Sequence, residues 1–402
     1  MKIRKVSLVE GLGGYWNIDH EAVKRGAVAD GFTYKGKSVT EGFDSIIQPA
    51  KAISMIIKLS DGGIALGDGV WVCYGGRVKR ESFTPIHHLK GILEKVIAPR
   101  LEGREVTSFR ELAGDITSQS GIPSILGYGL TQALLDAVAK SRGKCMAEVL
   151  AEEYGLSLAE TPIPLLVQCG EDWYRGVDKC ILRRIPYFPH GNINTGERFE
   201  ELPIHIKWTV KRIQELGGGD YNPTLHYDLY GHLGYFFKNN LEEMADYILE
   251  LEGLAEPYSL QLEDPVSMNS QDEQIRAMKE LRKALRDRGS RVRIVADEWA
   301  PSLEDVKKFV DAGASDIQQV KCPDLGGINH IVEAILYCKD RGVKPYLGGS
   351  CTETDISARA TVHIALATKP EILMAKPGMG VDEAVSITQN EIMRTLHLIK
   401  DE

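Results

Sequence analysis

The sequence lacks the features that mark a secreted, membrane-spanning or nucleic-acid-binding protein. Its seven cysteines form no Cys-Xaa-Xaa-Cys or Cys/His spacing, so neither a disulfide framework nor a zinc site is expected. It has no N-terminal signal pattern, and no apolar run approaches the roughly 18 residues of a membrane span. Lys and Arg are scattered and the net charge is −9, which argues against a nucleic-acid surface. We therefore expect a cytoplasmic protein with a small-molecule partner.

The chain is predicted to contain two domains with a boundary near residue 160. Its 402 residues exceed a typical single domain, and a hydrophobic fraction of 43% can bury a sizeable core. Residues 1–160 are predicted to be α+β, with strand-like runs in a mixed sheet, a mobile Gly-rich loop from Gly11 to Gly36, and helical periodicity from about residue 86 to 155. Residues 161–402 alternate between strand and helix patterns.

Eight strand candidates occupy the second domain, and helical segments separate them. They are IPLLVQ, ILRRIPYFPH, TLHYDLYG, SLQLEDP, RIVADEW, IQQVKCP, KPYLGGS and ILMAKPG. A doubly wound sheet also alternates in this way, but carboxylates from three consecutive strands face one centre more easily in a closed barrel. The predicted fold class is therefore α/β, with a (β/α)₈ or TIM-type barrel.

Three acidic residues stand at the ends of consecutive strand candidates. Asp228, Glu263 and Asp297 recur at spacings of 35 and 34 residues. A βαβ unit needs roughly 30 or more residues, so each carboxylate is expected at the C-terminal end of its own parallel strand. Converging carboxylates repel one another unless a cation lies between them, and an all-oxygen set with room for water suits Mg²⁺. The sequence predicts a catalytic Mg²⁺ site.

Other polar residues near the strand ends are candidates for the chemistry. Because side chains alternate along a strand, Gln319 and Lys321 are expected to point into the barrel mouth together. Lys321 is the candidate general base, since a nearby cation can lower a lysine pKa to about 7–8, although most strand-end lysines are solvated surface groups. His190 ends the second strand and is either catalytic or structural. His226 is expected only to orient Asp228.

The remaining polar positions carry weaker signals. Gln168 ends the first strand, where it can bind a substrate carboxylate or amine or simply make a loop contact. The loop from Leu347 to Thr354 offers backbone amides near a helix start, which suits an anionic group. The glycines of residues 376–383 lack the spacing of a nucleotide-binding loop. Cys351 is the thiol expected near the site, although most buried cysteines simply pack.

Long segments of the chain are similar to one family. The chain resembles the 3-methylaspartate ammonia-lyases, a branch of the enolase superfamily, over nearly its whole length. The segments are DGFTYKGKSVTEGF, GLTQALLDAVAK, HYDLYG, QLEDP, VADEW, QVKCPDLGGIN, GGSCTET and KPGMGVDEA. The resemblance implies an N-terminal α+β capping domain over the barrel, a homodimer, and Mg²⁺-dependent elimination of ammonia from (2S,3S)-3-methylaspartate to give mesaconate. It also implies a role in amino-acid degradation, such as glutamate catabolism, and K⁺ as a monovalent activator.

The same resemblance assigns roles to residues. Asp228, Glu263 and Asp297 match the metal ligands, Lys321 matches the base on one face of the substrate, and His190 matches its partner on the opposite face. The positions that match substrate-binding residues are Gln168, His190, Gln319, Ser350 and Cys351. The proton that is removed lies beside a carboxylate and is a very weak acid, so the developing charge needs electrostatic stabilisation from the metal.

Three positions depart from the family pattern. Cys73 stands before Tyr74 where the family has a glutamine, and it is expected to border the amine side of the substrate. Ser350 replaces a threonine and keeps the hydroxyl, while Met374 replaces a leucine in the apolar wall. Two alternatives remain open: another enolase-superfamily racemase or sugar-acid dehydratase with the same metal chemistry, and a non-catalytic barrel that retains a metal site.

Overall fold

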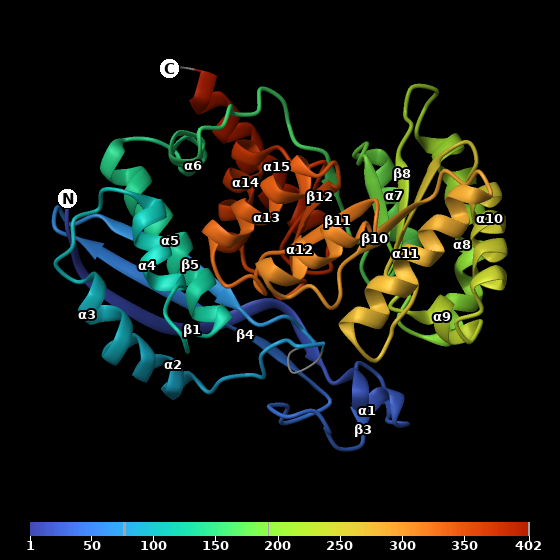
Figure 1. The fold of residues 1–402 in the computed structure, drawn as a ribbon, viewed down its shortest axis with the longest axis horizontal. Helices are drawn as coiled ribbons and strands as arrows, with labels where there is room; N and C mark the ends of the chain where they lie inside the picture. The colour runs from blue at the N-terminus through green and yellow to red at the C-terminus, as the bar shows by residue number, and fades with distance from the viewer. Residues whose placement is uncertain (75–77, 192, 401–402) are drawn as a thin grey trace.

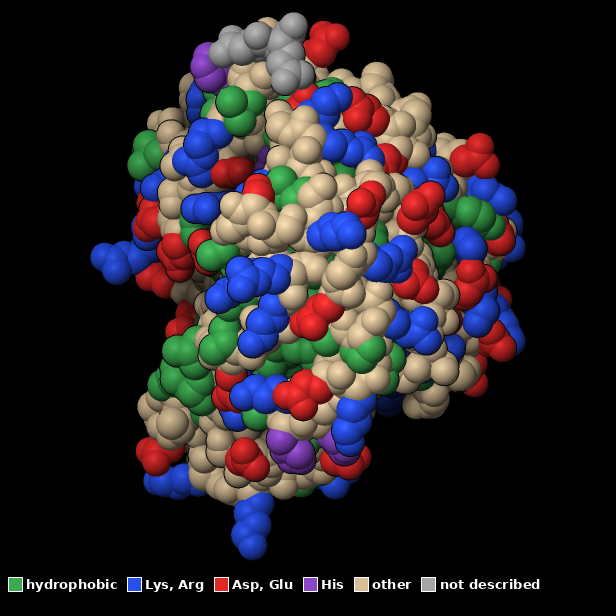
Figure 2. Space-filling view, turned by 90° about the vertical axis from the view of Figure 1, so that its left-hand side faces the viewer, with side chains coloured by type: hydrophobic (Ala, Val, Ile, Leu, Met, Phe, Trp, Pro, Cys, Tyr) green, Lys and Arg blue, Asp and Glu red, His purple; other side chains and the backbone are tan. Residues whose placement is uncertain are grey.

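The fold consists of a strand-and-helix cap beside a closed barrel (Figure 1). The computed structural model describes residues 1–74, 78–191 and 193–400. None of the described helices combines the length and apolarity needed to cross a bilayer. On the face of the cap seen in Figure 2, acidic and basic side chains are interspersed rather than gathered by sign.

The cap contains a three-stranded sheet in the order β1-β4-β5. Its strands are β1 (Ile3–Ile18), β4 (Ile47–Leu59) and β5 (Ile64–Val70). Alternate β4 residues Ile53, Met55 and Ile57 are fully buried, as the two-residue period of a strand with one covered face requires. Both strand pairs are antiparallel, so the predicted mixed sheet is wrong. The connection from β4 to β5 is a short turn, too short for the crossover that a parallel pair needs.

The Gly-rich stretch between Gly11 and Gly36 is also more regular than predicted. It contains the end of β1, the helix α1 (His20–Lys24) and a hairpin of β2 (Val28–Asp30) with β3 (Thr33–Lys35). Asp19 caps the helix by accepting a hydrogen bond from the Ala22 amide at 3.2 Å. Gly31 has a φ of +64° at the hairpin turn, a conformation that glycine adopts without strain. The glycines serve turns and close contacts here, so the predicted loop is replaced by short regular elements.

Helices cover the sheet over the region where the sequence predicts them. They are α2 (Ile86–Ile92), a π-helical turn (Leu93–Ile97), α3 (Ala98–Leu101), α4 (Phe109–Thr117), α5 (Ser124–Arg142) and α6 (Met146–Tyr154). The long helix α5 packs against β4 and β5. A Cβ atom on Gly69 of β5 would lie 2.0 Å from the Ile125 carbonyl oxygen, so this strand needs glycine to let the helix approach.

The eight predicted barrel strands all form, and they close in the order β10-β11-β12-β13-β6-β7-β8-β9 with parallel pairing. They are β6 (Leu165–Leu166), β7 (Tyr187–His190), β8 (Thr224–Asp228), β9 (Ser259–Glu263), β10 (Arg293–Ala296), β11 (Ile317–Lys321), β12 (Lys344–Gly348) and β13 (Ile372–Met374). The barrel prediction is confirmed.

Helices follow the strands and surround the barrel (Figure 1). They are α7 (Trp173–Leu182), α8 (Gly196–Leu216), α9 (His232–Phe236), α10 (Leu241–Ala255), α11 (Gln271–Asp287), α12 (Leu303–Ala312), α13 (Ile328–Asp340), α14 (Asp355–Thr368) and α15 (Val381–Lys400). Helix α11 illustrates their start: the Ser270 side chain accepts a hydrogen bond from the Glu273 amide, and two acidic residues fill the first turn. Such helices fix the strand ends that carry the polar residues.

Candidate active site

A cavity of about 820 Å³, its open mouth included, lies where the C-terminal ends of the barrel strands face the cap. All the site residues predicted from the sequence line it. These are Cys73, Gln168, His190, Asp228, Glu263, Asp297, Gln319, Lys321, Ser350 and Cys351. The C-terminal face is where parallel barrels assemble residues from several strands.

The three predicted metal ligands occupy neighbouring strand ends. Asp228 and Glu263 are the last residues of β8 and β9 and stand opposite each other in the strand register, while Asp297 directly follows β10. All three are buried. Burial, followed by the charge of Glu263, raises the pKa of Asp228 well above its ordinary value, and burial followed by the charge of Asp297 does the same for Glu263. The Asp297 Oδ1 atom has no hydrogen-bond partner among the described residues.

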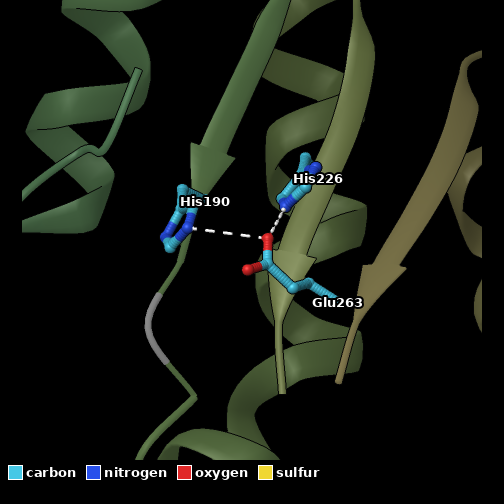
Figure 3. A group of neighbouring side chains, drawn as sticks. All are labelled: His190, His226 and Glu263. Atoms are coloured by element: carbon cyan, nitrogen blue, oxygen red, sulfur yellow. Dashed lines mark hydrogen bonds and ion pairs between the residues drawn. The ribbon is translucent and has the colours of Figure 1, made fainter. Parts of the chain in front are cut away.

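Glu263 is fixed by two neighbours from inside the barrel. His226 Nε2 lies 2.7 Å from Glu263 Oε2, and Gln319 Nε2 donates to Glu263 Oε1 at 2.6 Å. Burial lowers the pKa of His226 to about 4, so the ring is neutral and its Nε2–H donates to the carboxylate. Figure 3 shows the His190 and His226 rings both directed at the same carboxylate oxygen of Glu263. His226 therefore orients Glu263, and the predicted partnership with Asp228 is wrong because the side chain reaches across to the adjacent strand.

A second hydrogen bond fixes the tautomer of His226. With the Gln261 amide oriented so that its nitrogen faces His226 Nδ1 at 3.1 Å, its oxygen accepts from Arg293. Arg293 in turn pairs with Glu371 at the other end of the barrel. The chain of donors runs from Arg293 through Gln261 and His226 to Glu263, and each polar group in it has a partner.

Lys321 lies in an acidic environment. Its Nζ atom is 2.5 Å from Asp297 Oδ2 and 3.7 Å from Glu298 Oε1. Burial by itself lowers the pKa of Lys321, but the charges of Asp297 and Glu298 outweigh burial and raise the pKa above its ordinary value. The protein's own charges therefore do not produce the lowered lysine pKa expected from the sequence. That lowering requires a cation, which would bind the same carboxylates.

His190 faces the cavity from the opposite side of the barrel mouth. Its Nδ1 atom lies 3.2 Å from Gln168 Nε2, and its Nε2 atom lies 3.8 Å from Glu263 Oε2. The ring stacks on His226 with centroids 5.4 Å apart. The φ angle of His190 is +60°, in the left-handed region that non-glycine residues rarely adopt, and such strain concentrates at functional sites.

The loop after β12 differs from the anion site suggested by the sequence. The Ser350 amide donates to Glu353 Oε2 at 3.0 Å. This amide is therefore already hydrogen-bonded to an acidic side chain of the protein rather than free to bind an anion. Ser350 Oγ lies 2.9 Å from Thr352 Oγ1, and the hydroxyl still lines the cavity. The wall also contains Met374, as expected.

Several cavity residues were missed by the sequence reasoning. Tyr15 of β1 reaches over from the cap and donates to Glu171 Oε1 at 2.9 Å, and Arg198 donates to the Glu171 carbonyl oxygen. The sequence signal that could have identified Tyr15 is the pair of glycines directly before it. A Cβ atom on Gly14 would lie 2.4 Å from the Glu353 carbonyl oxygen, so only glycine lets β1 approach the barrel rim this closely.

Two groups of potential metal ligands meet the spacing of a shared ion among the described residues. One comprises His190, His226 and Glu263, and the other comprises Asp264, Asp297 and Glu298. Neither is the predicted trio, although each contains one of its members. Asp264 already accepts from the Glu298 amide at 2.8 Å, and the His226 proton is committed to Glu263. The predicted trio stays a prediction, and its oxygen donors match the preference of Mg²⁺.

Comparisons with known proteins decide the family. A family model described as the methylaspartate ammonia-lyase N-terminus matches residues 1–155, and one described as the C-terminus of the same enzyme matches residues 157–401. The chain belongs to the methylaspartate ammonia-lyase family. It is 48% identical to methylaspartate ammonia-lyase 1 of Carboxydothermus hydrogenoformans, with 100% of this chain and 97% of that protein covered.

Solved structures agree with this membership. The structure of the Citrobacter amalonaticus methylaspartate ammonia-lyase containing (2S,3S)-3-methylaspartic acid has a TM-score of 0.96 at 39% identity, and the Mg complex of the Clostridium tetanomorphum enzyme has 0.92 at 41% identity. Both alignments cover 100% of both chains. Muconate cycloisomerase from Pseudomonas fluorescens, at 18% identity with a TM-score of 0.63 over 91% of this chain and 84% of that one, shares the fold. The predicted family and capped-barrel fold are confirmed.

Proposed function

We propose that this methylaspartate ammonia-lyase family member eliminates ammonia from (2S,3S)-3-methylaspartate to give mesaconate, with Mg²⁺ as its metal. The observation that carries the proposal is the single cavity that gathers Lys321, His190 and three buried carboxylates beneath the cap. The two relatives whose structures contain methylaspartic acid or Mg support the choice of substrate and metal.

Asp228, Glu263 and Asp297 are proposed to hold the Mg²⁺ ion. The three carboxylates are buried, burial and mutual repulsion raise the pKa values of Asp228 and Glu263, and the Asp297 Oδ1 atom has no partner among the described residues. A divalent cation offsets this repulsion, so the donor set fits the ion. Mg²⁺, when bound, supplies the positive charge that stabilises negative charge on the substrate carboxylate as the C3 proton leaves.

Lys321 and His190 are proposed to act on opposite faces of substrate C3. Lys321 Nζ accepts the C3 proton of the (2S,3S) substrate, the C–H electron pair forms the C2–C3 double bond, and ammonia leaves with the C2–N electron pair. Lys321 must be neutral to accept this proton, so its contact with Asp297 has to weaken in the loaded site. His190 is proposed to act in the same way on the (2S,3R) epimer, with the same balance of bonds.

The amine side of the substrate is proposed to face two amide oxygens. Gln168 Oε1 and Gln319 Oε1 are buried and have no hydrogen-bond partner among the residues that the structure describes. Each is an acceptor, and a substrate ammonium group is a donor that satisfies buried acceptors. Ser350, Cys351 and Cys73 complete the proposed substrate-binding surface.

The remaining predictions are part of the proposal. We propose a capping domain over residues 1–160 and a barrel domain over residues 161–402, a homodimer, K⁺ as a monovalent activator and a cytoplasmic role in amino-acid degradation. The two family models, which meet near residue 156, support the two domains, and the resemblance to the family is the basis for the homodimer and K⁺. The free state of all seven cysteines supports a reducing compartment. No observation favours the racemase, dehydratase or non-catalytic alternatives.

The test is an ultraviolet assay for a conjugated dicarboxylate when the protein is mixed with (2S,3S)-3-methylaspartate, Mg²⁺ and K⁺. We expect chelation to abolish activity and Mg²⁺ to restore it. Asp297→Asn should weaken Mg²⁺ binding, whereas Asp287→Asn, which changes a largely exposed carboxylate on α11, should not. Full activity after exhaustive chelation contradicts the metal assignment, and absence of product from the loaded enzyme contradicts the substrate.

A further inference from the structure

Two thiols from different parts of the molecule meet in the wall of the cavity. Cys73 follows strand β5 of the cap, and Cys351 lies in the loop after β12 of the barrel; both line the cavity. The two side chains interact, and each is the largest influence on the pKa of the other. The two segments are also joined beside the thiols, because Thr352 Oγ1 donates to the Trp71 carbonyl oxygen at 2.6 Å.

We propose that Cys73 and Cys351 form an oxidisable dithiol site, whose disulfide ties the cap to the barrel and closes the substrate cavity. The oxidant is a hydroperoxide. The consequence for activity rests on the proposed lyase function, whereas the chemistry of the thiol pair does not.

The chemistry needs one nucleophilic thiolate and one resolving thiol. The contact with Cys351 lowers the pKa of Cys73; burial opposes this shift, and the charges of Lys321 and Arg80 add to it. A lowered pKa increases the fraction of reactive thiolate. The same contact, followed by burial, raises the pKa of Cys351, which keeps its proton until the second step.

The steps balance with hydrogen peroxide as the oxidant. The Cys73 thiolate attacks one peroxide oxygen, the O–O bond breaks, and the products are a sulfenic acid and hydroxide, which takes a proton to become water. The Cys351 sulfur then attacks the Cys73 sulfur, the S–OH bond breaks, and the Cys351 proton leaves with the hydroxyl as a second water. Two thiols and one peroxide become one disulfide and two waters.

A second thiol pair provides an internal comparison. Cys169 Sγ and Cys180 Sγ are 3.7 Å apart, and both side chains are buried. Burial, followed by the hydrogen bond with Cys180, raises the pKa of Cys169 well above its ordinary value. Neither thiol lines the substrate cavity. Among the described residues, both pairs of thiols therefore lie close together. The pair Cys73 and Cys351 also lines the cavity, where peroxide has access, and includes a thiol with a lowered pKa.

The experiment treats the fully reduced, full-length protein with hydrogen peroxide, blocks remaining thiols by alkylation, and maps disulfide-linked peptides by mass spectrometry. The same samples are assayed for mesaconate formation before and after addition of dithiothreitol. We expect a peptide that joins Cys73 to Cys351, the loss of two alkylatable thiols, and loss of activity that dithiothreitol restores. Methylaspartate with Mg²⁺ should slow the reaction, because the occupied cavity excludes peroxide.

Three variants distinguish oxidation of this pair from general oxidation of the protein. The loss of activity of each variant is expressed as a fraction of that variant's own starting rate. Cys73→Ser should largely prevent the reversible inactivation, because serine cannot form a sulfenic acid with peroxide. Cys351→Ser should form no disulfide at Cys73 and should leave a sulfenic acid there, because no resolving thiol remains. Cys180→Ser, in the comparison pair, should behave like the parent.

A map that shows only a Cys169–Cys180 disulfide, or equal reversible inactivation of the parent and Cys73→Ser, overturns the proposal. Circular dichroism of each variant verifies its fold. If the reduced parent makes no mesaconate, the proposed function fails, while the peptide map still decides the dithiol site.

Discussion

Single residues in the cavity are positioned by contacts that reach across strands. Glu263 receives one hydrogen bond from His226 on the preceding strand and one from Gln319 two strands further along the barrel. Lys321 is paired with Asp297 from the strand beside it. The contacts to Glu263 hold a proposed metal ligand in place, which reduces the reorganisation that the reaction needs, whereas the Lys321–Asp297 pair has to weaken before Lys321 can accept a proton.

The two-base proposal predicts opposite stereochemical effects. Each base can remove only the proton that the substrate presents to its face. Lys321→Ala should therefore lose the (2S,3S) reaction far more than the (2S,3R) reaction, and His190→Ala should do the reverse. The expected loss is about 10²–10⁴ in rate, measured as kcat/KM for each epimer. Retained Mg²⁺ binding in both variants serves as the control. If both replacements depress both epimers equally, His190 reverts to a binding or structural role.

His226 is predicted to act through Glu263. His226→Phe keeps an aromatic ring but removes the donor that holds Glu263, so Mg²⁺ affinity should fall about 10–100-fold. Titration of the thermal midpoint with Mg²⁺ measures this change, and activity should recover at high Mg²⁺.

The matched control for His226 is His205→Phe. His205 is another buried histidine whose burial lowers its pKa, to about 3, but its ring stacks on Trp173 at a centroid distance of 3.7 Å and its partner is the Tyr227 hydroxyl. This variant should alter stability and leave Mg²⁺ affinity unchanged. Equal effects of the two changes on Mg²⁺ affinity argue against a positioning role for His226.

At the scale of elements, glycines determine how closely β5 and α5 can pack. The sequence reasoning missed β5, because its segment IALGDGV has glycines where a strand normally has β-branched residues. Those glycines face the backbone of α5: a Cβ atom on Gly67 would lie 2.1 Å from the Gly129 carbonyl oxygen. The strand is therefore fixed by packing rather than by propensity.

Gly69→Ala is predicted to lower the free energy of unfolding by about 1–3 kcal/mol, because the added methyl group forces β5 and α5 apart. Urea denaturation measures the change. Gly91→Ala is the control: it lies within helix α2 with nothing within 4 Å of the added Cβ, so alanine should be neutral or stabilising by up to about 1 kcal/mol. If Gly69→Ala unfolds with the same free energy as the parent, the close packing of β5 against α5 is contradicted.

At the scale of the whole molecule, the cap and the barrel share a buried polar network. Tyr128 of helix α5 donates to Glu353 Oε1 at 2.7 Å, and Lys376 Nζ lies 2.9 Å from Glu353 Oε2. Lys376 also donates to the Gly348 carbonyl oxygen at the end of β12. The network joins the cap to the loop that carries Ser350 and Cys351, so the position of the cap and the shape of the cavity are coupled.

Tyr128→Phe is predicted to lower the free energy of unfolding by about 1–3 kcal/mol, because it leaves a buried carboxylate oxygen of Glu353 without its donor. KM for methylaspartate should rise as the rim loop loosens, and calorimetry together with steady-state kinetics checks both effects. Tyr235→Phe, which removes the hydroxyl of a ring that is 84% exposed, should change neither quantity. Stability and KM equal to those of the parent exclude a coupling role for Tyr128.

The sequence by itself determined the barrel, its strands and the position of the polar residues along them. Strand periodicity and the placement of Asp228, Glu263 and Asp297 at strand ends are local patterns, and backbone geometry then directs strand-end residues to one face. That is why the predicted site residues of the barrel line the same cavity, even though their individual roles remain predictions, whereas Cys73 reaches it only because of where the cap rests.

Only the tertiary structure decided which atoms meet. His226 contacts Glu263 instead of Asp228, the Ser350 amide is taken by Glu353, and Cys73 lies against Cys351. These contacts join elements that are distant in the chain, and they depend on strand stagger and on where the cap rests. Periodicity carries no information about either, because it reports the exposure of one element and not the partner that covers it.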